Sequence, residues 1–256
     1  MPGFGINWLK RILHEDDRND GLDHLKHYYG LEHNSEILKY VKTEVIVSNP
    51  ENIPLTGGII FASNHPLGWL DGMALVKAVG DKRPDVRFFV NDILKGLRNY
   101  GDIFVGVNKL GNTSRQSLEI IANVYASEAA ILVFPAGLVS RELKEGIQDL
   151  EWNKSFISKA IKYNKPIIPV YIEGRNSSFF YNLSKWRKRL FIKANIEMIF
   201  LPDEMFKQQC KTIHVHIGNK IDPSFFDKSH SEKDWAEKVR GYIYSNDFKA
   251  GNALKV

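Results

Sequence analysis

Strand-like and helix-like segments alternate along this chain from residue 41 onward, and this alternation restricts the fold more than any other feature. Short apolar segments rich in β-formers, such as 59–62 and 130–134, are separated by longer segments that suit helices. We therefore expect an α/β fold with a mixed, largely parallel sheet covered by helices on both faces. The expected strands are 44–47, 59–62, 86–90, 103–105, 130–134, 166–172, 197–200 and 213–217, and the expected helices are 71–79, 92–98, 113–126, 153–163 and 232–244.

The first forty residues differ from this pattern. They contain two helix-like stretches joined by the polar run 15–21, so residues 1–40 are expected to form a helical appendage and residues 41–256 the α/β domain. No apolar stretch approaches the eighteen residues that a membrane-spanning helix needs, and the N-terminus lacks the long apolar core of a secretory signal. We expect a cytoplasmic protein that is peripheral on the inner face of the membrane.

The segment 63–72 places a histidine and an aspartate close together at the end of the expected strand 59–62. Asp71 suits the N-cap of the following helix, and a histidine at a strand end is often only a packing residue. The alternative is a catalytic pair, which requires the loop containing Pro66 and Gly68 to fold back so that Asp71 meets His65. Asp71 would then fix one imidazole nitrogen, and the other would accept a proton from a hydroxyl.

A second strand, 130–134, also ends at a proline and a glycine, and a cationic residue follows. Backbone N–H groups at Gly137 can approach an anion, and Arg141 is suited to bind a phosphate or carboxylate with two hydrogen bonds. The simpler alternative is an ordinary turn followed by a solvated arginine. Pro135, Gly137, Ser140 and Arg141 are therefore candidates for substrate binding.

Charge and cysteine content restrict the class of function only weakly. The formal net charge is +5 and the sequence pI is about 9.1, which fits an anionic ligand, nucleic acid or an anionic membrane. A single cysteine, Cys210, excludes an internal disulfide framework. His214 and His216 share one face of the strand expected at 213–217, yet no third ligand has suitable spacing, so we expect no metal.

The segment 179–193 mixes aromatic residues with a dense run of lysine and arginine, and residues 4–13 have a similar character. This mixture is expected of a segment that lies on an anionic bilayer. The alternatives are that the apolar side chains pack on the core while the cations are solvated, or that the segment binds nucleic acid. No other feature supports nucleic acid, and we do not expect it as a partner.

Residues 63–71, 101–105, 134–141 and 168–174 resemble, in order and spacing, the four sequence blocks of the glycerolipid acyltransferase family, which includes lysophosphatidic acid acyltransferases. The resemblance covers about residues 41–218. The first block, Asn-His followed by Asp, is present as Asn64, His65 and Asp71, with five intervening residues where the family has four. The fourth block is present as Ile168-Pro169-Val170.

Blocks two and three depart from the family pattern. Val107 stands where the family has an arginine, and Arg115 is the candidate to replace it. Ala136 stands in place of the glutamate of the third block, and Val139 in place of its arginine. These positions are the ones that the resemblance assigns to phosphorylated acceptors. The chain looks more like the bacterial branch that acylates the hydroxyl of an N-acylated amino acid to make ornithine or glycine lipids.

The resemblance implies a glycerol-3-phosphate acyltransferase-like fold and an O-acyltransferase of membrane lipid synthesis. Its co-substrate would be an acyl thioester of coenzyme A or acyl carrier protein, with no other cofactor, and its acceptor a lysolipid. His65 would act as the base and Asp71 would orient it, while Asn64, Gly68, Pro135, Gly137, Ser140, Arg141 and Arg115 would bind substrate, with N–H groups near Gly68 or Gly137 facing the oxyanion. An ordinary lysophospholipid acyltransferase and a non-catalytic lipid-binding protein are the alternatives.

Overall fold

The computed structural model describes residues 26–91, 98–107 and 115–255. A seven-stranded sheet has the order β1-β9-β8-β2-β5-β3-β4. Five neighbouring strands are parallel: β8 (Ile167–Ile172), β2 (Ile59–Ser63), β5 (Ala130–Val133), β3 (Val86–Asn91) and β4 (Phe104–Val107). The strand β9 (Thr212–Ile217) runs antiparallel to β8 and parallel to β1 (Glu44–Ser48). The mixed, largely parallel sheet predicted from the alternating pattern is therefore confirmed.

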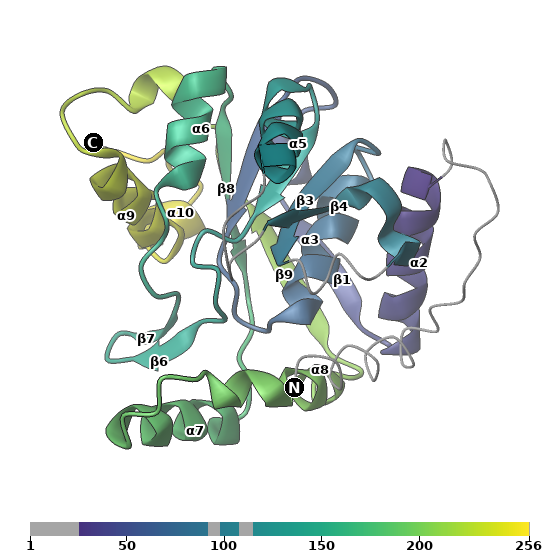
Figure 1. Ribbon diagram of the computed structural model, residues 1–256, viewed down its shortest axis with the longest axis vertical. Helices are drawn as coiled ribbons and strands as arrows, with labels where there is room; N and C mark the ends of the chain where they lie inside the picture. Colours follow the sequence, from purple (N-terminus) through teal and green to yellow (C-terminus); the bar gives the residue numbers. More distant parts are fainter. Residues whose placement is uncertain (1–25, 92–97, 108–114, 256) are drawn as a thin grey trace.

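Helices cover both faces of this sheet (Figure 1). The central strand β2 is buried on both sides, and its successive side chains alternate between two apolar cores. Phe61 lies in the core shared with α2 (Lys26–Tyr40) and α3 (Trp69–Gly80). Ile60 lies in the other core, shared with α5 (Arg115–Ala126), α6 (Ser155–Tyr163), α9 (Glu232–Ile243) and α10 (Asn246–Lys249).

Several short elements lie at the carboxyl end of the parallel strands, the lower end in Figure 1. They are the hairpin of β6 (Arg141–Leu143) and β7 (Gly146–Gln148), the helix α7 (Ser178–Arg189), the 3-10 helix η4 (Ile196–Phe200) and α8 (Leu201–Phe206). Three further 3-10 helices are η2 (Pro50–Asn52), η3 (Arg98–Ile103) and η5 (Pro223–Phe225). Ligands of open α/β sheets bind outside the carboxyl ends of the strands, so a ligand site is expected beside these elements.

The strand predicted at 197–200 is wrong, because this segment forms the 3-10 helix η4. The first residue of the segment, Glu197, is fully buried and bonded to two arginines. The β6–β7 hairpin and α10 were not predicted. The helix predicted at 92–98 lies almost entirely outside the described residues, as do residues 4–13.

The described part of the N-terminal segment is bonded to the rest of the protein. Asn34 on α2 donates from its side-chain amide to the carbonyl oxygen of Met73 at 3.0 Å, and the hydroxyl of Tyr100 donates to the Asn34 side chain at 3.3 Å. The domain boundary near residue 40 stays a prediction. Within the described ranges, every helix is too short or too polar to cross a lipid bilayer.

Candidate active site

The segment that carries His65 begins where β2 separates from β8. There the side chain of Asn64 replaces a backbone link: its amide nitrogen donates to the carbonyl oxygen of Ile172 at 2.9 Å, and its oxygen accepts from the Ile172 N–H at 2.7 Å. Asn64 is buried, with 2% of its surface exposed. In this structure Asn64 fixes the start of the loop, whereas the resemblance implied that it binds substrate.

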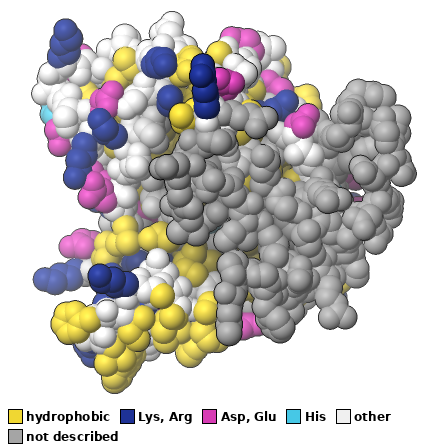
Figure 2. Space-filling view, in the orientation of Figure 1, with side chains coloured by type: hydrophobic (Ala, Val, Ile, Leu, Met, Phe, Trp, Pro, Cys, Tyr) yellow, Lys and Arg dark blue, Asp and Glu magenta, His cyan; other side chains and the backbone are white. Residues whose placement is uncertain are grey.

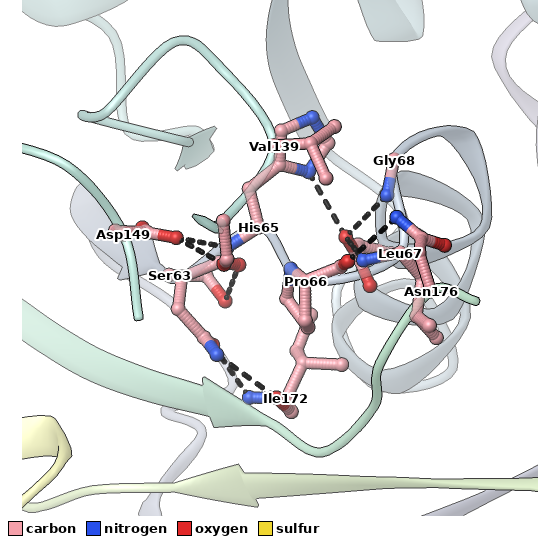
Figure 3. A network of polar contacts seen from close by, with 12 residues as sticks. Ser63, His65, Pro66, Leu67, Gly68, Val139, Asp149, Ile172 and Asn176 are labelled. Carbon is pink, nitrogen blue, oxygen red and sulfur yellow. Dashed lines mark hydrogen bonds and ion pairs between the residues drawn. The ribbon is translucent and has the colours of Figure 1, made fainter. Parts of the chain in front are cut away.

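The loop folds back as a pairing of His65 with Asp71 requires (Figure 3). Nδ1 of His65 lies 3.0 Å from Oδ2 of Asp71, and the same oxygen accepts from the backbone N–H groups of Leu67 at 2.7 Å and Gly68 at 2.9 Å. Asp71 is the third residue of α3, and Gly68 is the N-cap. The predicted N-cap position of Asp71 is therefore wrong, because its carboxylate reaches back to the cap residue.

Gly68 accommodates the additional residue between His65 and Asp71. Its φ is +85°, in the left-handed region that side chains disfavour. A Cβ atom there would also lie 3.1 Å from Cδ2 of Leu201. Glycine thus gives this loop the sharp turn that brings the two side chains together.

Burial and hydrogen bonding set the electrostatics of the pair. Asp71 is fully buried, and this burial raises the pKa of its carboxyl, while the hydrogen bond and charge of His65 and the N–H groups of Leu67 and Gly68 oppose the rise. With the carboxylate accepting at Nδ1, that nitrogen carries hydrogen and Nε2 keeps its lone pair. The His65 side chain is 18% exposed and stacks on Phe134 with ring centroids 4.2 Å apart. Such an imidazole is suited to remove a proton from a hydroxyl.

A second buried carboxylate lies on the other side of His65. Oδ1 of Asp149, just after β7, accepts from the His65 backbone N–H at 3.1 Å and from the Ser140 hydroxyl at 2.5 Å. The N–H of Ser140 donates to the His65 carbonyl oxygen at 2.8 Å. Burial raises the pKa of Asp149, and the hydrogen bonds from Ser140 and Trp152 oppose the rise. The predicted substrate residue Ser140 therefore contacts the backbone of His65.

The two glycines proposed for an oxyanion site use their N–H groups within the chain. The Gly68 N–H donates to Asp71, and the Gly137 N–H donates to the carbonyl oxygen of Phe134 at 3.0 Å, in a turn where Gly137 has a φ of +62°. The carbonyl oxygen of Pro135 accepts from the N–H of Asn153 at 3.0 Å. The structure therefore gives Gly68, Pro135 and Gly137 roles in shaping the loops, and an oxyanion site near the two glycines stays a prediction.

Arg141 belongs to a buried group of three charged residues. Its Nη2 lies 2.7 Å from Oε1 of Glu197, its Nη1 donates to the carbonyl oxygen of Val139, and its guanidinium lies over the ring of Phe180. Nε of Arg187 on α7 lies 2.8 Å from Oε2 of the same glutamate. Arg141 is 3% exposed and shares Glu197 with Arg187, so the structure buries the guanidinium that was predicted to clamp an acceptor anion.

Replacing Glu197 with glutamine is expected to lower the free energy of unfolding by about 3–5 kcal/mol, because two buried guanidinium groups lose their counter-charge. Burial would raise the pKa of Glu197, but its own amide and the two arginines outweigh it and hold the pKa below its usual range. Urea unfolding at neutral pH measures the loss. Glu142→Gln, which removes a surface ion pair to Lys185, is the matched control and should change stability little. Equal stabilities of the Glu197 variant and wild type would contradict this.

Arg115 is placed at the first turn of α5. Its side chain is 94% exposed and pairs with Glu119 at 3.3 Å, and no contact among the described residues links it to His65. The substitution of Arg115 for a family arginine therefore stays a prediction without structural support.

Two residues of the site were missed by sequence reasoning. Asp149 follows a hairpin whose tip glycine, Gly146, has a φ of +114°, and recognising that turn in the sequence would have placed Asp149 opposite Ser140. Asn176 follows β8, and its side-chain amide donates to the carbonyl oxygen of Pro66 at 3.1 Å. Its backbone N–H donates to the Tyr181 hydroxyl at 3.0 Å, so α7 is tied to the His65 loop.

The two histidines of β9 do not form the centre of a metal site in the described residues. Their ring centroids are 6.4 Å apart, and Nε2 of His216 lies 2.7 Å from Oε1 of Glu173. Across the described ranges, no group of three or more histidine, cysteine, aspartate or glutamate side chains is arranged to hold a metal ion.

Comparison with known proteins identifies relatives along nearly the whole chain. A family model described as "Acyltransferase" matches residues 1–251. A lyso-glycine lipid O-acyltransferase from Phocaeicola vulgatus is 38% identical over 245 residues, covering 95% of this chain and 88% of that protein. One from Bacteroides thetaiotaomicron is 39% identical over 245 residues, covering 95% and 90%.

A solved structure shares the fold. The crystal structure of the 1-acyl-sn-glycerophosphate (LPA) acyltransferase PlsC from Thermotoga maritima superposes with a TM-score of 0.55 and 17% identity, covering 93% of this chain and 88% of that one. At this identity the similarity establishes the fold alone, and it agrees with the sheet and helices described above.

Proposed function

This chain belongs to the acyltransferase family, and from that premise we propose that it transfers a fatty acyl group from an acyl thioester to the hydroxyl of a lyso-glycine lipid. The observation that carries the mechanism is the pairing of His65 with the buried Asp71. The two relatives named for this acceptor are 38% and 39% identical over nearly the whole chain, which supports the choice of acceptor.

The mechanism needs only one general base. Nε2 of His65 takes the proton as the acceptor oxygen attacks the thioester carbonyl carbon, and Asp71 stabilises the imidazolium that forms. When the carbon–sulfur bond breaks, the imidazolium returns the proton to the departing thiolate. The products are the O-acylated lipid and a free thiol, without a covalent acyl-enzyme. The donor thiol is that of coenzyme A or acyl carrier protein.

The acceptor proposal also rests on where the site departs from the family pattern. The side chains of Ala136 and Val139 offer no charge or hydrogen bond to a phosphate, and the guanidinium of Arg141 is buried and paired with Glu197. These residues favour an acceptor without phosphate over lysophosphatidic acid. The buried and hydrogen-bonded Asp71 supports a catalytic protein over a lipid-binding one, because burying an idle carboxylate costs free energy.

The proposed reaction is tested by incubating the purified protein with lyso-glycine lipid and a labelled acyl thioester, either of coenzyme A or of acyl carrier protein. Mass spectrometry should detect the O-acylated product and an equal amount of free thiol. An N-acylglycine acceptor without the hydroxyl is the control and should give no product. Thiol release without an acylated lipid would mean hydrolysis and would contradict the proposal.

We further propose that the protein binds an anionic membrane through α7 and the segment that follows it. The apolar face of this region consists of exposed side chains, which Figure 2 shows as a yellow area at the lower end of the molecule: Phe179, Trp186, Leu190, Phe191, Ile192 and Ile199. Exposed cations lie beside it, namely Lys188, Arg189 and Lys193. Aromatic residues flanked by cations suit the interface of an anionic bilayer.

Some side chains of the segment 179–193 pack inside the protein, as the alternative to membrane contact predicted. Phe180 and Tyr181 are buried in a small core, and Arg187 is bound to Glu197, so these three residues do not face a membrane. Phe191, in contrast, is 90% exposed and has a φ of +55°, a conformation that costs a non-glycine residue roughly 1–2 kcal/mol. A strained and exposed phenylalanine supports a role in contacting lipid.

Replacing Lys188, Arg189 and Lys193 with glutamine should weaken binding to anionic vesicles. Each cation near such a surface contributes about 1 kcal/mol, so the three together predict a loss of roughly 100-fold. Co-sedimentation with vesicles that contain phosphatidylserine measures the loss. The matched control replaces Lys220, Lys228 and Lys249, exposed lysines that follow β9. Equal binding by the two triple variants, or binding that salt leaves unchanged, would contradict this membrane face.

A further inference from the structure

Three hydrogen bonds join the backbone of His65, the carboxylate of Asp149 and Ser140 in a closed ring. The His65 N–H donates to Oδ1 of Asp149 at 3.1 Å, and the Ser140 hydroxyl donates to the same oxygen at 2.5 Å. The Ser140 N–H returns to the His65 carbonyl oxygen at 2.8 Å. Both polar backbone atoms of His65 are therefore held by residues from beyond the β5 turn, as Figure 3 shows for Asp149.

Asp149 is itself held from the opposite side. Its Oδ2 accepts from Nε1 of Trp152 at 2.8 Å, and its backbone N–H donates to the hydroxyl of Tyr244 at 2.9 Å. Its carbonyl oxygen accepts from Nη1 of Arg240 on α9 at 3.3 Å. The carboxylate is fully buried. Asp149 therefore links the helix α9, through its carbonyl oxygen, to the backbone of His65, through its solvent-shielded carboxylate.

The two carboxylates hold different parts of the same residue. Asp71 bonds Nδ1 of the His65 ring and sets its tautomer, whereas Asp149 bonds the main chain from which the ring projects. A proton transfer needs the base within hydrogen-bond reach of the acceptor hydroxyl, and a misplacement of about 1 Å can cost about 100-fold in rate. Fixing the ring alone does not fix where Nε2 lies.

We propose that Asp149 is a positioning residue, an inference that rests on the proposed acyl transfer. Through its hydrogen bonds with Ser140 and the His65 backbone, Asp149 holds His65 where the imidazole can take the proton. A residue that acts in this way alters the turnover number and leaves the affinity for the acceptor nearly unchanged, because it does not touch substrate. It also alters the hydrogen bond between His65 and Asp71, which a spectrum reports without any reaction.

The experiment compares Asp149→Ala and Ser140→Ala with wild type in kcat, KM, melting temperature and the downfield proton resonance of the His65 Nδ1–H. Arg83→Met is the matched control: it removes a buried guanidinium that pairs with Asp85 and donates to the Pro54 and Glu128 carbonyl oxygens. Arg83 precedes the amino end of β3, whereas His65 follows the carboxyl end of β2, in the same parallel part of the sheet. We expect Asp149→Ala to lower kcat about 100-fold with KM within about two-fold, and to shift or broaden the His65 resonance. Ser140→Ala should lower kcat about tenfold, a smaller loss, since the two bonds to the His65 backbone remain.

Arg83→Met should lower the melting temperature with kcat within about two-fold of wild type and the resonance unchanged. An Asp149→Ala variant with unchanged kcat or an unchanged resonance would overturn the proposal, as would an equal loss of kcat in Arg83→Met. If Asp149→Ala does not fold, Ser140→Ala decides by the same criteria. If wild type transfers no acyl group, the proposed function fails, and the resonance alone decides the role of Asp149.

Discussion

His65→Ala is expected to lower the rate of acyl transfer by about a thousandfold or more while the protein stays folded. The structure leaves Nε2 of His65 to accept the hydroxyl proton, and general base catalysis contributes about 10²- to 10⁴-fold. The loss should appear in kcat, because the base acts in the transition state. Initial rates of thiol release, with the lipid product quantified in the same samples, measure it.

The matched control is His214→Ala, which removes a half-buried histidine from β9 on a strand that does not carry the site. Its rate should match that of wild type. Circular dichroism of both variants shows whether the fold is intact. If a folded His65→Ala protein retained wild-type turnover, His65 would not be the base.

Asp71→Asn is expected to lower kcat by about 10³- to 10⁴-fold without unfolding the protein. Nδ1 of His65 and the N–H groups of Leu67 and Gly68 all bond Oδ2 of Asp71, so an asparagine oxygen in that place can still accept from all three. The neutral amide, however, no longer stabilises the imidazolium that forms when Nε2 takes the proton. Rate measurements, with a ¹⁵N spectrum that shows whether Nδ1 still carries hydrogen, test this account.

Asp71→Asn is expected to lower kcat without lowering the free energy of unfolding. Because burial raises the pKa of Asp71 above its value in the unfolded chain, the ionised carboxylate opposes folding. This cost is full above the folded pKa, shrinks as the pH falls below it and disappears at the unfolded pKa. Asp71→Asn should therefore be at least as stable as wild type at neutral pH, with a difference that shrinks as the pH falls. A variant that is active, or one that is markedly less stable at neutral pH, would contradict this account of the pair.

Most of the sheet could be predicted because the fold depends on local patterns. The apolar runs of β2, β5 and β8 are buried on both faces, so they read as continuous apolar segments, and the helices between them are long enough to recognise. The apolar residues 198–200 indicate a strand in the sequence, but the segment forms a 3-10 helix. The pairing of Glu197 with two arginines elsewhere in the chain could not be predicted from that local pattern.

The site was predictable only where its residues are neighbours in the chain. His65 and Asp71 lie six positions apart, and Gly68 between them indicates that the chain can fold back. Arg141 was assigned to substrate because its partner, Glu197, follows it by 56 positions. Asp149 was missed for the same reason, since its bond to His65 spans 84 positions and depends on a hairpin that was not predicted.

The most direct test of the central claim is a comparison of two acceptors with one donor. Wild-type protein is given the same acyl thioester with lyso-glycine lipid or with lysophosphatidic acid, and the two values of kcat/KM are measured. We predict a preference of at least about tenfold for lyso-glycine lipid, because Arg141 is buried and paired with Glu197, and the side chains of Ala136 and Val139 offer no phosphate contact. Equal values, or a preference for lysophosphatidic acid, would contradict the account.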